Sequence, residues 1–322
     1  MNLIEETFAR LSAVPLTTVL RDVPMAGYTR FGIGGAADIY VETGDPSSFV
    51  AALKLARESG LETVVIGGGT NLIVSDDGFR GVVLRLANHR IDSTGTSVYV
   101  ESGAVLQDLV DYTVEHALKG LETMTGIPGS VGAAIYGNAG AYGHSIAERI
   151  DTVHFFDGDE VRAFNREQCE FHYRESIFKR HKEWIVFHAN LGMEAGDREA
   201  LREASHKILT VRNAKYPPTM KCAGSVFKNF LLAELPANVA SEVPEKVVIE
   251  GKVPSAWFLE QVGAKGMKSG DIHVADYHAN LIYNAGQGTA EELTGVIDEL
   301  KRRVGDRWGI PLEEEVQYIG FK

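Results

Sequence analysis

The chain has 322 residues, of which 44% are hydrophobic and 24% charged, a composition typical of a globular protein with two or three domains. Its net charge of −12 argues against nucleic-acid binding. No apolar run reaches the roughly 20 residues that a membrane helix needs, and no basic stretch precedes an apolar one at the N-terminus, so a cytoplasmic protein without a signal peptide is expected. Cys169 and Cys222 lack C-x-x-C spacing, which fits a reducing compartment.

In chain order, the first half of the sequence predicts alternating helices and strands. A short amphipathic helix is expected within residues 1–20, and Asp45 with Pro46 marks the start of a second helix, which Gly60 ends. The β-branched run 63–66 predicts a strand. The remaining expected elements are a helix over 105–119 and strands over 81–86, 97–102, 150–156, 160–164 and 184–192. This half is therefore expected to be α+β.

The second half predicts helices separated by longer loops. A helix over 197–212 leads into it, and Pro254 opens a helix that continues to Gln261. Thr289 with Glu292 matches the capping-box pattern, so a long helix is expected after them. The other expected features are the end of that helix near 303, a loop and strand over 221–229, a polar excursion over 238–252 and a final strand over 312–319.

Two loops are unusually rich in glycine. Residues 126–143 contain six glycines, and residues 67–69 are three consecutive glycines after the strand predicted at 63–66. Glycine costs conformational entropy, so such runs indicate that the backbone approaches a ligand closely, as in the N–H nests that bind a pyrophosphate. Neither loop has the G-x-G-x-x-G spacing of a dinucleotide fold, and no G-K-[ST] motif is present. Together they predict one extended, phosphorylated ligand.

Read alone, the polar residues outside these loops support no single reaction. Arg174 is typical of a surface ion pair, and Ser225 lacks the G-x-S-x-G context of a hydrolase nucleophile. Glu315 ends a run of three glutamates, and strand alternation turns it to the opposite face from Glu314. The ten histidines show no metal-ligand spacing, so no metal site is expected.

Six segments taken together resemble the MurB family, the UDP-N-acetylenolpyruvoylglucosamine reductases of bacterial peptidoglycan synthesis. They are residues 29–38, 66–76, 126–143, 173–179, 223–229 and 312–320, in the family's order. The resemblance implies an α+β fold, with an FAD-binding domain of the vanillyl-alcohol-oxidase (PCMH) type over 1–195 and an α+β substrate-binding domain over 196–322. It also implies that the final strand returns Glu315 to the active site.

The resemblance further implies an NADPH-dependent UDP-N-acetylmuramate dehydrogenase that contains FAD. In this family, flavin N5 gives a hydride to the enolpyruvyl group of UDP-N-acetylglucosamine enolpyruvate, and the product is UDP-N-acetylmuramate. Ser225 matches the proton donor, and Arg174 and Glu315 match residues that stabilise the enol-like intermediate. Substrate contacts match Tyr173, Lys215, Asn229 and His278. FAD contacts match Gly67, Gly68, Gly69, Thr70, Asn71, Leu72, Gly126, Ile127, Pro128, Ser130, Val131, Gly132, Asn138 and Gly140.

Two other functions stay open at this point. Another oxidoreductase of this fold, such as a sugar or alcohol oxidase, lacks the segments around Ser225 and Glu315. A non-catalytic sugar-nucleotide or flavin-binding regulator would keep the glycine loops and lose Arg174, Ser225 or Glu315. The first glycine loop has no histidine, so non-covalent FAD is expected. The chain resembles the branch of the family without a tyrosine-bearing loop, and a monomer without nucleic-acid or membrane partners is expected.

Overall fold

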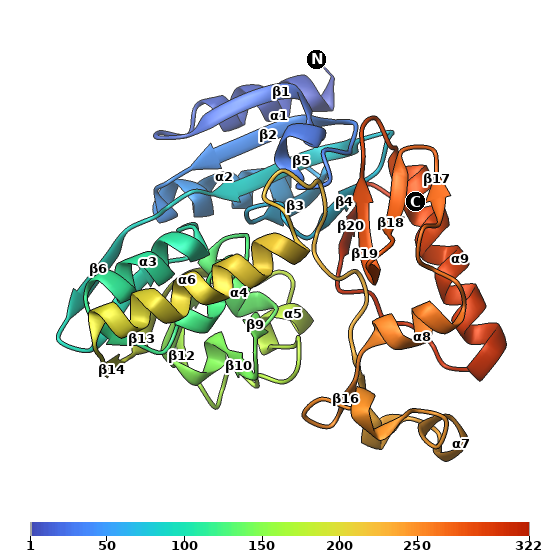
Figure 1. The fold of residues 1–322 in the computed structure, drawn as a ribbon. Helices are drawn as coiled ribbons and strands as arrows, with labels where there is room; N and C mark the ends of the chain where they lie inside the picture. The colour runs from blue at the N-terminus through green and yellow to red at the C-terminus, as the bar shows by residue number, and fades with distance from the viewer. Residues whose placement is uncertain (1, 322) are drawn as a thin grey trace. The chain divides into compact units, whose positions relative to one another are not determined.

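The computed structural model in Figure 1 describes residues 2–321. The chain divides into two compact units, and three segments form each of them. Unit 1 consists of Met1–Val23, Ala37–Gly69 and Arg80–Pro217, and unit 2 of Pro24–Ala36, Thr70–Phe79 and Pro218–Lys322. The units divide after Pro217 rather than at the expected boundary of 195, because the helix that follows residue 195 packs against other helices of unit 1.

The first sheet of unit 1 has four strands, in the order β1 (Thr18–Pro24), β2 (Ala36–Thr43), β5 (Phe79–Leu86) and β3 (Glu62–Ile66). Two helices share its core, α1 (Leu3–Ser12) and α2 (Pro46–Glu58). Helix α2 begins where the sequence predicts, because the Asp45 carboxylate accepts a hydrogen bond from the Ser48 N–H (2.7 Å) and Pro46 lies in the first turn. Strands β3 and β5 are parallel.

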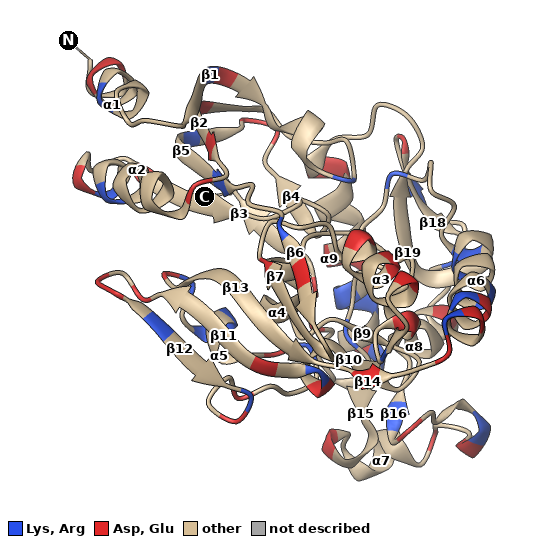
Figure 2. Cartoon of the chain, turned by 90° about the vertical axis from the view of Figure 1, so that its left-hand side faces the viewer, with Lys and Arg blue, Asp and Glu red and all other residues tan. Residues whose placement is uncertain are grey.

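The second sheet of unit 1 is antiparallel, in the order β12 (Val161–Asn165), β11 (Ile150–Phe156), β13 (Ile185–Gly192), β7 (Ser97–Glu101) and β6 (Ile91–Thr94). One face of it shares a core with α3 (Leu106–Glu115) and α4 (Val131–Tyr136). Helix α6 (Arg198–Lys215) packs beside α3, and charges of both signs line it in Figure 2. The shorter elements are β8 (Leu118–Lys119), η2 (Glu122–Met124), β9 (Gly140–Ala141), β10 (His144–Ser145), η3 (Ile146–Glu148), α5 (Ile177–Arg180) and β14 (Glu194–Ala195).

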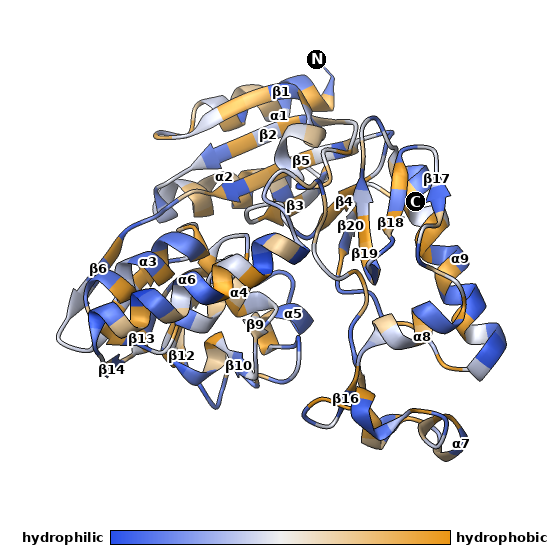
Figure 3. Cartoon of the chain, viewed as in Figure 1, coloured by the Kyte–Doolittle hydropathy of each residue, from blue (hydrophilic) through white to orange (hydrophobic). Residues whose placement is uncertain are grey.

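Unit 2 is built around the long helix α9 (Ala290–Trp308) and a sheet of β17 (Lys268–Ser269), β18 (Ile272–Ala275) and β19 (His278–Asn284). The predicted capping box starts α9, and Gly309 ends it with a left-handed φ of 68°. Buried residues Leu293, Ile297 and Leu300 recur at helical spacing, which gives α9 the apolar side visible in Figure 3. The other elements are η1 (Met25–Tyr28), β4 (Leu72–Val74), β15 (Phe230–Leu231), η4 (Leu232–Glu234), α7 (Ala237–Ala240), η5 (Glu245–Val247), β16 (Lys252–Val253), α8 (Ser255–Gln261) and β20 (Gln317–Ile319).

Two segments expected as strands differ from the prediction. Residues 225–229 form isolated β-bridges instead of a strand. Ser225 pairs with Leu281 and Phe227 pairs with Glu314, so no single neighbouring segment pairs with the whole stretch. The final strand is shorter than 312–319 and covers Gln317–Ile319, where it pairs in parallel with β4.

Candidate active site

The two glycine-rich loops of unit 1 lie in backbone contact. The first contains Gly67 and Gly68, and the second contains Gly129 and Ser130. A Cβ atom added to Gly68 would lie 3.4 Å from both the Gly129 Cα and the Ser130 N, and one added to Gly67 would lie 2.9 Å from Ser130 Oγ. A side chain at position 67 would therefore meet Ser130 at the start of the second loop, and the Ser130 hydroxyl would have to move to make room for it.

Four backbone N–H groups of these loops donate to no acceptor within residues 2–321, namely those of Gly68, Gly69, Gly129 and Ser130. Gly69 and Ser130 are themselves buried. Buried N–H groups almost always have a partner, so several unpaired ones in touching loops suit an anionic group from outside the chain. The pyrophosphate of FAD fits this donor set.

The rest of the second loop is fixed by the chain itself. The Gly132 N–H donates to the Ser102 carbonyl (2.7 Å), and the Gly126 N–H donates to Gln107 Oε1 (2.7 Å). Val131 is fully buried. These predicted FAD contacts therefore hold the loop in shape, with their own donors already used. Two further predicted contacts of this loop, Ile127 and Pro128, are half-buried.

Arg174 is tied to the end of the same loop. It lies in a tight turn in which the N–H groups of His172 and Glu175 each donate to the other's carbonyl (3.0 and 3.2 Å), and its φ is 57°. The guanidinium donates to the carbonyls of Gly140 (2.9 Å) and Asn138 (3.4 Å), while the Asn138 side chain donates to the His172 carbonyl (2.8 Å). An arginine keeps a left-handed backbone conformation only where the surrounding hydrogen bonds impose it.

Unit 1 also contains two predicted substrate contacts, Tyr173 beside Arg174 and Lys215 at the end of α6. The Arg174 Cζ lies 5.2 Å from the ring centroid of Tyr173. Lys179 Nζ donates to the Arg174 carbonyl (3.1 Å) and pairs with Glu175 (2.8 Å). Lys215 is the last residue of α6. Unit 1 thus brings Arg174 together with Tyr173, Asn138 and Gly140.

In unit 2, the segment that carries Ser225 lies between two others. Half-buried Ser225 bridges to Leu281 on one side, and on the other side the Val226 carbonyl accepts a hydrogen bond from the Glu315 N–H (2.8 Å). The two predicted catalytic residues of this unit, Ser225 and Glu315, are therefore neighbours through their backbones.

Asn71 contacts the Glu315 segment as well. Its side-chain amide donates to the Glu315 carbonyl (2.7 Å), and its own carbonyl accepts a hydrogen bond from the Gln317 N–H (2.9 Å). Leu72, the next residue, lies opposite Gln317 in the parallel pair of strands. Thr70, Asn71 and Leu72, which the family resemblance assigns to FAD, thus belong to unit 2, whereas the glycines before them belong to unit 1.

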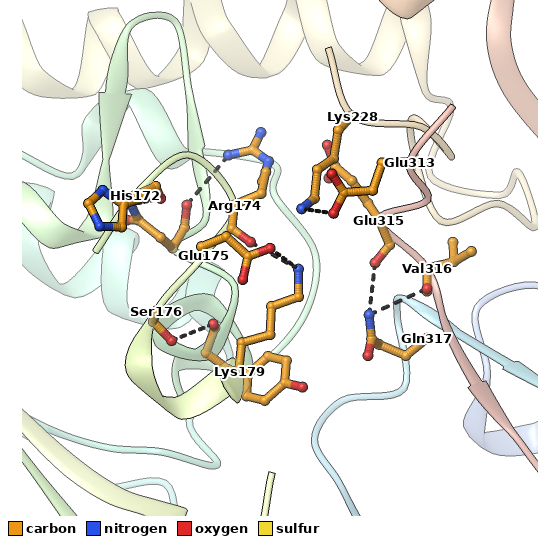
Figure 4. Close-up of polar contacts among 12 residues, drawn as sticks. His172, Arg174, Glu175, Ser176, Lys179, Lys228, Glu313, Glu315, Val316 and Gln317 are labelled. Carbon is orange, nitrogen blue, oxygen red and sulfur yellow. Dashed lines mark hydrogen bonds and ion pairs between the residues drawn. The ribbon is translucent and has the colours of Figure 1, made fainter. Parts of the chain in front are cut away.

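The residues after Ser225 are held by their side chains. Buried Lys228 forms an ion pair with the exposed Glu313 carboxylate (Figure 4). Asn229, a predicted substrate contact, accepts a hydrogen bond from the Ser255 N–H at its Oδ1 (3.2 Å). The Ser255 hydroxyl donates to the Lys228 carbonyl.

Asn280 is a site residue that was not predicted from the sequence. Its side chain is 2% exposed and bonds to the backbone beside Ser225, and its N–H donates to Nδ1 of His278 (3.1 Å), a predicted substrate contact. A signal was available, because Asn280 and Asn284 are polar residues of low strand propensity in an otherwise apolar run.

Two protein families match this chain, and together the matches cover most of it. An FAD binding domain family matches residues 37–161, and the family of UDP-N-acetylenolpyruvoylglucosamine reductase C-terminal domains matches residues 216–319. A UDP-N-acetylenolpyruvoylglucosamine reductase of Solibacter usitatus is 63% identical over 311 residues, which cover 97% of this chain and 100% of that protein. The chain belongs to this reductase family. A reductase of the same name from Rubrobacter xylanophilus is 35% identical and covers 93% of this chain and 94% of its own length.

A solved structure agrees with the sequence relatives. The crystal structure of the reductase (MurB) from Thermus caldophilus matches with a TM-score of 0.73 and 28% identity, over 94% of this chain and 99% of that one. The predicted family and the predicted α+β fold class with an FAD-binding domain are confirmed, and so are FAD as cofactor and the assignment as an oxidoreductase.

No helix among residues 2–321 is both long and apolar enough to cross a bilayer. No group of three or more histidine, cysteine, aspartate or glutamate side chains in the same range could hold a metal ion.

Proposed function

We propose that this chain reduces UDP-N-acetylglucosamine enolpyruvate to UDP-N-acetylmuramate, with NADPH as the source of the hydride. The observation that carries the proposal is the 63% identity to a named reductase over almost the whole chain. Arg174, Ser225 and Glu315, the three residues that match the family's catalytic set, are all present. FAD, when bound, supplies the hydride chemistry between the nicotinamide and the enolpyruvyl group.

In this proposal, the two units divide the work. Unit 1 holds FAD without a covalent bond, through the free N–H groups of its glycine loops, and contributes Arg174, Tyr173 and Lys215. Unit 2 contributes Ser225, Glu315, Asn229 and His278. The predicted roles of residues 1–195 in FAD binding and 196–322 in substrate binding are thereby retained in outline. The enzyme acts as a monomer in the cytoplasm.

The proton steps belong to the chain's own residues. A hydride added to C3 of the enolpyruvyl group and a proton added to C2 convert its double bond into a lactyl ether. Ser225 Oγ gives the proton to C2 and recovers one from solvent. Negative charge builds on the adjacent carboxylate during the reaction, and the planar, permanently charged Arg174 guanidinium suits that carboxylate, with Glu315 as the second stabilising group.

The decisive test separates the two half-reactions by stopped flow. In Ser225→Ala, bleaching of the flavin absorbance by NADPH should proceed as in the wild type, because this step needs no proton from Ser225. Recovery of the absorbance on mixing with the enolpyruvyl substrate should slow by about 10²–10⁴-fold, the usual loss for a general acid. Ser225→Cys should retain more activity than the alanine variant, since a thiol still donates. Normal recovery with a lowered melting temperature would leave Ser225 structural.

The same assay separates the alternatives. NADPH oxidation that requires the enolpyruvyl substrate supports the reductase. Oxygen-dependent turnover of a sugar or alcohol would instead indicate an oxidase, and flavin binding without turnover would indicate a regulator.

A further inference from the structure

Asn280 clamps the backbone beside Ser225. Its Oδ1 accepts hydrogen bonds from the N–H groups of Val226 (3.1 Å) and Phe227 (2.9 Å), and its Nδ2 donates to the Phe227 carbonyl (2.8 Å). The side chain is 2% exposed, so water cannot readily replace these bonds. One side chain therefore satisfies three backbone groups of the dipeptide that follows Ser225.

Asn280 is itself fixed by the chain around it. Its carbonyl also accepts from the Val226 N–H (3.1 Å), and its N–H donates to His278 Nδ1 (3.1 Å). The next residue, Leu281, forms the bridge with Ser225. The start of strand β19 thus connects His278, proposed to contact the substrate, with the proposed proton donor.

We infer that Asn280 is the positioning residue for Ser225, which rests on the proposed role of Ser225 as proton donor. The hydrogen bonds of the Asn280 side chain fix the backbone on the C-terminal side of Ser225. They thereby fix the position of the Ser225 Cα, from which the hydroxyl-bearing side chain extends. A displacement of about 1 Å in a reacting group can cost about 10²-fold in rate. Only asparagine offers two acceptor sites and a donor at this reach, because aspartate lacks the donor and leucine lacks all three.

Asn284 supplies a matched control on the same strand. It is 4% exposed, its Oδ1 accepts from the N–H groups of Gly286 (3.0 Å) and Gly288 (2.9 Å), and its Nδ2 donates to the Phe31 carbonyl (3.0 Å). Asn284→Ala therefore removes three bonds of the same kind from a turn that does not carry Ser225.

The test compares the FAD-loaded variants by stopped flow and by melting temperature. Asn280→Ala should slow reoxidation of the flavin by the enolpyruvyl substrate about 10²-fold and leave flavin reduction by NADPH unchanged. Asn284→Ala should lower the melting temperature similarly, with near-normal reoxidation. If Asn280→Ala does not fold, Asn280→Asp, which keeps both acceptor bonds, should slow reoxidation about tenfold. A lowered melting temperature with normal reoxidation in the position-280 variant would overturn the inference.

A double variant shows whether Asn280 acts through Ser225. Asn280→Ala added to Ser225→Ala should slow reoxidation no further, because the group being positioned is already gone. Additive slowing would mean that Asn280 acts elsewhere and would overturn the inference. A slow Ser225→Ala beside a normal Asn280→Ala rejects only the role of Asn280, whereas a normal Ser225→Ala rejects the proposed proton donor.

Discussion

The side-chain amide of Asn71 donates a hydrogen bond to the backbone carbonyl of Glu315 (2.7 Å), a residue 244 positions away in the chain. This contact joins the segment after the first glycine loop to the segment that carries a proposed catalytic carboxylate. Because the side chain of Asn71 is engaged in this bond, its main effect on the enzyme should be on Glu315.

Asn71→Ala should therefore slow substrate-dependent reoxidation more than it weakens FAD binding. Loss of the hydrogen bond should also destabilise unit 2 by about 1 kcal/mol. Flavin titration and stopped-flow reoxidation of the same preparation measure both effects. A large rise in the FAD dissociation constant with unchanged reoxidation would instead make Asn71 a cofactor contact, as the family resemblance suggests.

Gly129→Val should weaken FAD binding. Gly129 has a φ of 119° and lies against Gly68, so a β-branched residue both strains the backbone and obstructs the touching loops. Gly95→Val is the matched control, because Gly95 also has a positive φ (59°) and no atoms lie within 4 Å of an added Cβ. Both variants should lose stability, and only the first should lose flavin on gel filtration. Equal flavin retention would count against the loop contact as the FAD site.

Arg174→Lys should slow reoxidation by about 10²-fold while NADPH still reduces the flavin normally. The guanidinium donates to two carbonyls of the glycine-rich loop at once, and a lysine ammonium cannot reproduce that planar geometry. Arg180→Lys, which changes an exposed ion pair with Glu170, should behave as the wild type. Wild-type reoxidation in Arg174→Lys would remove Arg174 from the proposed mechanism.

Stability should fall in mild acid because of His188. Burial and the stacked imidazole of His154, with ring centroids 4.2 Å apart, lower the pKa of His188 from 6.5 to about 4. Between these values the unfolded chain binds a proton that the folded chain does not, so folding weakens as pH drops from 6.5 towards 4, and the effect is constant above 6.5. His188→Gln should flatten the melting temperature against pH in this window. Identical slopes for variant and wild type would contradict this assignment.

Local signals explain why much of the fold is readable from the sequence. The first N–H groups of α2 and α9 are satisfied by residues within four positions, namely Asp45 with Pro46 in α2 and Thr289 with Glu292 in α9. Each helix start can therefore be predicted from a short stretch of sequence. The glycine loops are equally local, since a run of residues without side chains already indicates backbone contact.

The remainder depends on residues far apart in the chain. Asn280 meets Val226 and Phe227 across more than fifty positions, and no spacing rule identifies such a pair. The segment around Ser225 has a strand-like pattern, yet its partners change from Leu281 to Glu314 within two residues, so a regular strand does not form. The division after Pro217 could not be predicted for a similar reason. It depends on the packing of α6 against α3, and the sequence of α6 alone does not show which helix it contacts.

The parallel pair of β4 and β20 has a consequence for synthesis of the protein on the ribosome. Ile73 and Val74 are 1% and 0% exposed, and they lie opposite Tyr318 and Ile319. Gln317, the first residue of β20, follows Val74 by 243 positions (317 − 74), so these two apolar residues lack their partner strand until that whole stretch has been translated. A nascent chain halted before residue 317 therefore presents an unpaired apolar strand edge, which is a binding site for chaperones and a starting point for aggregation.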